Sequence, residues 1–167
     1  KVWIACGSGL IQYDPVGGTL TQTINGGSGV GSQCTALDIS PDGQVIVAAM
    51  TSSRTHVSTD GGATFTEVSN NGVGQGYGRI EYAISHEKAD NGNYYVYASC
   101  AGAFLSGIYM SEDNGINWSQ IAPANNQQPG SFSPFSTGGG SGQGTYNNII
   151  TVQKGNPKKC FLGGIDC

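Results

Sequence analysis

The chain contains one short motif twice, and this repetition constrains its fold more than any other feature. Residues 58–65 read STDGGATF, and residues 111–118, which begin 53 positions later (111 − 58), read SEDNGINW. A degenerate copy at residues 13–20, YDPVGGTL, keeps the glycine and the final large apolar residue but lacks both the Ser and the Asp. This spacing indicates one supersecondary unit that recurs along the chain.

The segments around the motif repeat as well. Apolar stretches precede the three copies at residues 2–6, 45–50 and 95–100, and a fourth stretch begins at residue 160. Further apolar stretches at 36–39, 82–84 and 149–152 come before the last three, each followed by a turn-forming segment. Pro41-Asp42-Gly43 and Gly155-Asn156-Pro157 are such turns, since Pro fixes φ and Gly or Asn tolerates positive φ. Each unit therefore predicts four strands.

Four strands in roughly 45 to 65 residues are typical of one blade of a β-propeller. No stretch shows apolar residues at helical spacing. We therefore expect an all-β fold, a β-propeller of four-stranded antiparallel blades, with about three blades' worth of chain, which is an incomplete ring. The expected divisions are a partial blade over 1–33, blades over 34–78 and 79–145, and the start of another over 146–167. The expected partner is the remainder of the same propeller or a larger polypeptide.

Composition excludes several other classes. The 28 glycines among 167 residues follow no triplet period, which excludes collagen. No apolar run approaches the ~18 residues of a membrane-spanning helix, so we expect no membrane span. A net charge of −4 and a pI of about 4.9 argue against a nucleic-acid partner. The five cysteines are not spaced as metal ligands usually are, and we expect neither a metal nor a cofactor. The low content of charged residues and the several cysteines favour a secreted or cell-surface protein.

The pattern Ser-x-Asp-x-Gly-x-Thr-Trp/Phe resembles the Asp-box, or BNR repeat, of sialidases, sortilin-like receptors and xyloglucanase-type glycoside hydrolases. The residues that carry the resemblance are Ser58, Asp60, Gly62, Thr64 and Phe65 in one copy, and Ser111, Asp113, Gly115 and Trp118 in the other, where Asn117 replaces Thr. The elements Gly-Gln-Gly-x-Tyr, Asn-Pro and Gly-Gly-Ile-Asp of the later units also resemble repeats in large secreted proteins of Bacteroidota.

The chemistry of the motif favours a structural role over a catalytic one. A Ser or Asp side chain in a turn accepts hydrogen bonds from nearby backbone N–H groups and so closes the turn. Gly permits a backbone conformation that a Cβ would strain, and a terminal aromatic side chain packs between sheets. Asp60 and Asp113 are therefore expected to stabilise turns rather than to act as a pair of catalytic carboxylates.

The resemblance implies that ligands bind at the face opposite the motifs. That face would be built by the connections 7–9, 25–33, 52–55, 70–78, 101–106, 125–145 and 164–166, and loops on a rigid scaffold commonly carry binding sites. The candidate ligand-binding residues on these connections or beside them are Arg54, Tyr77, Phe132, Phe135 and Tyr146. The aromatic side chains are suited to stacking on sugar rings, or alternatively to packing into the blade below.

Catalysis has weaker support in the sequence. A sialidase clamps its substrate carboxylate with several arginines, but this chain has only Arg54 and Arg79. A glycosidase needs two carboxylates, for which Asp166 is the one weak candidate, with Asp38 and Glu81 nearby in the expected fold. His56 and His86 lack a Ser or Cys partner at a recognisable spacing. Two functions remain open: an extracellular binding or adhesion scaffold for glycan or protein, or part of a secreted glycoside hydrolase.

Overall fold

The computed structural model describes residues 1–25, 33–51, 54–73, 77–123, 134–135 and 142–164. Within these residues the regular secondary structure is almost entirely β-strand, and all the strand pairs are antiparallel. The expected all-β class is confirmed, as is the expectation of four-stranded antiparallel sheets. One short helix, α1 (Gly144–Asn147), was not predicted, because four residues are too few to show a helical period.

The strands form four sheets in chain order. The first sheet contains β1 (Val2–Cys6), β2 (Gly9–Asp14) and β3 (Thr19–Asn25). The second contains β4 (Cys34–Ile39), β5 (Ile46–Met50), β6 (Arg54–Ser58) and β7 (Thr66–Glu67). The third contains β8 (Arg79–Ile84), β9 (Val96–Ala101), β10 (Leu105–Ser111) and β11 (Ser119–Ala122). The fourth pairs β12 (Ile149–Val152) with β13 (Cys160–Gly163).

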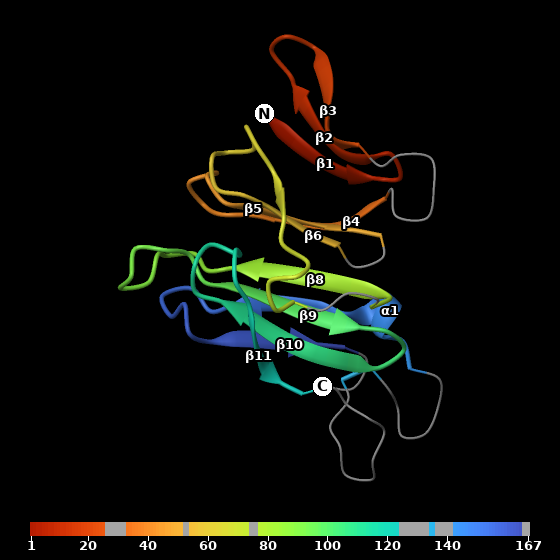
Figure 1. The fold of residues 1–167 in the computed structure, drawn as a ribbon, viewed down its shortest axis with the longest axis vertical. Helices are drawn as coiled ribbons and strands as arrows, with labels where there is room; N and C mark the ends of the chain where they lie inside the picture. The colour runs from red at the N-terminus through yellow and green to blue at the C-terminus, as the bar shows by residue number, and fades with distance from the viewer. Residues whose placement is uncertain (26–32, 52–53, 74–76, 124–133, 136–141, 165–167) are drawn as a thin grey trace.

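Successive sheets pack face to face, and Figure 1 shows the first three in order along the long axis. One apolar cluster, including Val47, Val57, Tyr82 and Trp118, lies between the second and third sheets. A second cluster, including Tyr97 and Ile150, lies between the third and fourth. Since alternate residues of a strand point to opposite faces, both sets of side chains are buried in a sheet that is covered on both sides. All six residues of β9 are accordingly buried, and all but Ser99 are of hydrophobic type.

The first strands of three units lie beside one another. β4 contacts β8, β8 contacts β12, and each of the three is an edge strand of its own sheet. Asp38 on β4 links two of them directly, because its Oδ2 accepts a hydrogen bond of 2.7 Å from the backbone N–H of Ile84 on β8. The sheets are therefore joined along their first strands as well as through their faces.

The ends of the strands define two faces of the molecule. The turns between first and second strands lie at one end with the motif turns, and we call this the turn face. The connections between second and third strands and between successive sheets lie at the other end, which we call the loop face. Figure 1 shows the turns after β4, β8 and β12 on the left and α1 on the right. Candidate ligand-binding residues were predicted for the loop face.

The structure corrects the predicted position of one candidate residue, and it does not describe two others. Arg54 was expected on the connection 52–55, but it begins β6 and pairs with Met50 across the sheet. Phe132 and Asp166 lie outside the described residues. Within the described part of the chain, no helix is long and apolar enough to cross a membrane.

Candidate functional site

The two motif turns share one hydrogen-bond pattern. In the first, Ser58 Oγ donates to Asp60 Oδ1 (2.7 Å) and accepts from the N–H of Gly62 (2.8 Å). The Asp60 carboxylate also accepts bonds from the N–H (2.9 Å) and hydroxyl (2.7 Å) of Thr64. Because these bonds favour the ionised form, the backbone and side-chain bonds from Thr64 and the bond from Ser58 lower the pKa of Asp60 to about 2.

The second turn reproduces this arrangement with a different donor. Ser111 Oγ donates to Asp113 Oδ1 (2.7 Å) and accepts from the N–H of Gly115 (2.9 Å). Asn117 supplies both its backbone N–H (2.8 Å) and its side-chain amide (2.7 Å) to Asp113, in place of the Thr64 hydroxyl. Burial raises the pKa of Asp113, but the bonds from Asn117 and Ser111 outweigh it and the pKa lies below its usual value. Both carboxylates are therefore occupied in closing turns.

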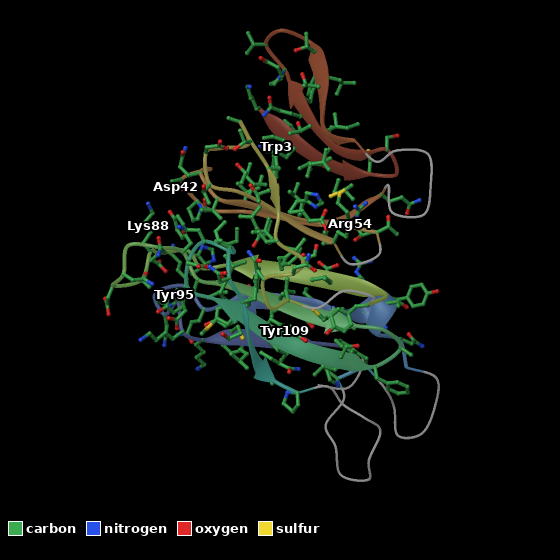
Figure 2. All side chains as sticks on the ribbon, in the orientation of Figure 1. Trp3, Asp42, Arg54, Lys88, Tyr95 and Tyr109 are labelled. Atoms are coloured by element: carbon green, nitrogen blue, oxygen red, sulfur yellow. The ribbon has the colours of Figure 1, made fainter. Side chains whose placement is uncertain are left out.

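Each motif also contacts the sheet before it. Gly62 has a φ of +86°, and a Cβ there would lie 2.1 Å from Trp3 on β1. The ring of Phe65 meets Trp3 edge-on, with 5.7 Å between centroids, and Figure 2 shows Trp3 between the first two sheets. In the second motif, a Cβ at Gly115 would lie 3.2 Å from Val57 on β6 of the preceding sheet. Trp118 donates its indole N–H to Gly115 O at 2.8 Å, and its ring lies 6.2 Å from that of Tyr82 on β8. The motif turns thus contribute to the packing between sheets.

On the loop face, Phe135 anchors the segment that carries α1. Its side chain is fully buried against Ala101 and Leu105, between the third and fourth sheets. A ring in that position is not available for stacking on a ligand, so of the two roles considered for Phe135 the structure shows the packing role. Two backbone bonds fix the segment further, from Gln143 N to Phe135 O (2.8 Å) and from Gly144 N to Ala103 O (2.9 Å).

Tyr146 projects from this anchored helix and is 82% exposed. The helix packs closely on the third sheet because Gly144 has no side chain there. A Cβ at Gly144 would lie 2.6 Å from Gly102 O. A Cβ at Gly78 would lie 2.9 Å from Thr145 Cγ2, so α1 also touches the residue before Arg79. The result is an exposed aromatic ring on a closely packed helix beside the start of β8.

The other candidates on this face have polar partners. Tyr77 is partly buried, and its hydroxyl lies 2.8 Å from that of Tyr109. Burial and the Tyr109 hydroxyl raise the pKa of Tyr77. Arg54, which Figure 2 shows on the right, lies 3.7 Å from Glu67 Oε2, and the Nε2 atom of His56 lies 3.9 Å from the same oxygen. Arg54 is therefore part of a small charged group on β6 and β7.

Arg79 and Glu81 form an ion pair of 2.5 Å at the beginning of β8. Burial raises the pKa of Glu81, although the charge of Arg79 and its hydrogen bond oppose the shift. Behind this pair, the side-chain amide of Asn148 donates to Ser99 O at 2.8 Å and ties the entry of β12 to the third sheet.

Sequence reasoning missed Glu67, Thr145 and Asn148 as members of this region. The pairing of Glu67 with His56 depends on the register of a two-residue strand, which no periodic pattern predicts. Thr145 and Asn148 contact Gly78 and Ser99, which are far from them in the sequence. The described residues hold no group of three or more His, Cys, Asp or Glu suited to a metal ion. The chain matches no protein-family model and no curated protein.

Proposed function

We propose that this chain is a binding or adhesion scaffold that presents its loop face to a glycan or protein outside the cell or at its surface. The observation that carries the proposal is the helix α1, which packs closely on the third sheet and leaves Tyr146 82% exposed. Exposed tyrosines are suited to recognition because the ring is large, amphipathic and has little conformational entropy to lose. Arg79, Glu81 and Arg54 supply charged groups on the same face.

We further propose that the sheets belong to a β-propeller with Asp-boxes, completed by other blades. Support comes from the repeated stacking of sheets, the adjacency of β4, β8 and β12, and the shared bonding of the two motif turns. Ile149 (63% exposed) and Phe161 (49%) lie on the outward face of the fourth sheet. Val2 and Ile4 are exposed on the first sheet. Another sheet would cover these apolar side chains.

The binding proposal is tested with a glycan array and a panel of extracellular proteins, using the full chain. Tyr146→Ala should weaken binding of the ligand found by at least about tenfold, because a central aromatic anchor commonly contributes more than 1.4 kcal/mol. Leu20→Ala is the control, since it removes an exposed apolar side chain (66% exposed) from the start of β3, away from the loop face. Equal affinity of Tyr146→Ala and wild type would contradict the proposal.

A second candidate is part of a secreted glycoside hydrolase, and one observation favours it. Glu81 lies on the first strand of its unit with a raised pKa, the property that a carboxyl group needs to act as a general acid. Release of reducing sugar by the chain, abolished by Glu81→Gln without a change in melting temperature, would support hydrolysis. Glycan binding without turnover would support the scaffold.

A further inference from the structure

A hollow between three of the sheets lies on the turn face, away from the proposed binding face. Its volume is about 290 Å³, close to the lower end of the range for small-molecule pockets. Residues of β4, β8 and β12 line it together with the turns that follow β4 and β8. Its apolar wall includes Ile39, Ile84 and Ile150, and its polar groups include Asp38, His86 and Thr151.

Asp38 is the acidic group in this hollow, and its carboxylate is held in place by backbone donors. Oδ1 accepts a bond of 2.9 Å from the N–H of Ile39, and Oδ2 accepts one of 2.7 Å from the N–H of Ile84. These bonds fix the carboxylate at the junction of two sheets. A carboxylate has about four lone-pair sites, so two such bonds leave acceptor capacity for a ligand.

Asp38 belongs to none of the described ion pairs, whereas Asp42 pairs with Lys88 (3.5 Å), Glu67 with Arg54 and Glu81 with Arg79. Burial raises the pKa of Asp38, against the opposing effects of the Ile84 and Ile39 bonds and the charge of His86. A partly buried anion without a cation is costly, and a bound cation offsets that cost.

We propose that this hollow binds a small ligand with a primary ammonium group, which pairs with Asp38, and a compact body, which rests on Ile39, Ile84 and Ile150. An amino sugar is of suitable size and chemistry. The site goes beyond the proposed function, because it lies at the opposite end of the strands and uses none of the loop-face residues. Loss of one activity would therefore leave the other intact.

The test is a titration of the full, ¹⁵N-labelled chain with glucosamine, followed through the amide resonances of Ile39 and Ile84. We expect saturable shifts at both amides, and no saturable shifts with glucose or N-acetylglucosamine, which lack the ammonium group. Asp38→Asn should weaken glucosamine binding by about tenfold or more, because the charge is lost. Asp42→Asn, a carboxylate on the same face, should bind like wild type.

His86→Trp provides a second variant if Asp38→Asn unfolds the chain. His86 lines the hollow from the turn after β8 and is exposed, so a larger side chain there obstructs the ligand and leaves the bonds of Asp38 in place. The proposal predicts that this variant folds and loses glucosamine binding. Binding of neutral sugars equal to that of glucosamine, absence of binding to the wild type, or full binding by folded Asp38→Asn or His86→Trp would overturn it.

Discussion

The contact between Gly62 and Trp3 shows how a single residue of the motif contributes to packing between sheets. Gly62→Ala places a Cβ against the Trp3 ring and imposes a positive φ on Ala, so we expect a loss of about 2–4 kcal/mol of unfolding free energy. Gly43→Ala is the matched control, because Gly43 also has a positive φ (+71°) but has open space around it. Chemical denaturation of both variants measures the difference, and equal losses would show that the Trp3 contact is unimportant.

The lowered pKa values of Asp60 and Asp113 predict a dependence of stability on pH. A carboxylate with a folded pKa below 3.8 stabilises the fold above that pH, and the contribution is lost as pH falls through the folded value. Melting temperature should therefore fall between about pH 4 and pH 2. Asp60→Asn should flatten this fall and lower the melting temperature at pH 7. A variant with an unchanged pH profile would contradict the role of Asp60 in the turn.

At the scale of the elements, Phe135 is expected to hold α1 against the third and fourth sheets. Phe135→Ala removes a fully buried ring. It should lower the free energy of unfolding by about 3–5 kcal/mol, or else detach only the segment that carries α1 while the sheets stay folded. Hydrogen exchange at the amides of residues 143–147 distinguishes these results, because faster exchange confined to them indicates local release. Tyr146→Ala, which removes an exposed ring from the same helix, should change neither stability nor exchange. Unaltered exchange and stability in Phe135→Ala would refute the anchoring role.

The sequence predicted elements whose signal is local and missed those that depend on distant partners. Residues 2–6 and 149–152 are predicted as strands with the bounds that the structure has, and the other repeated apolar stretches coincide with strands to within a few residues. Arg54 was assigned to a connection because its pairing with Met50 leaves no periodic signal. The role of Phe135 stayed open because its partners Ala101, on β9, and Leu105, on β10, are far from it in the sequence. The ion pair of Glu67 with Arg54 likewise depends on register.

At the scale of the whole molecule, the repeated unit accounts for the arrangement of the sheets. The four sheets follow one another along the chain, and each packs on the next through alternate residues of its strands. If a further sheet packed on the fourth as the fourth packs on the third, it would cover Ile149 and Phe161. The ring remains a proposal, and it predicts that these two side chains are buried in the complete particle.

The central claim is that these sheets are successive blades around one axis, with β4, β8 and β12 innermost. Cryo-electron microscopy of the native particle that contains this chain tests it most directly. We expect a closed ring of antiparallel sheets, with another sheet packed on the outward face of β12 and β13 and with Tyr146 on an open rim. A particle in which that outward face lies in solvent, or in which β4, β8 and β12 do not share an axis, would contradict the account.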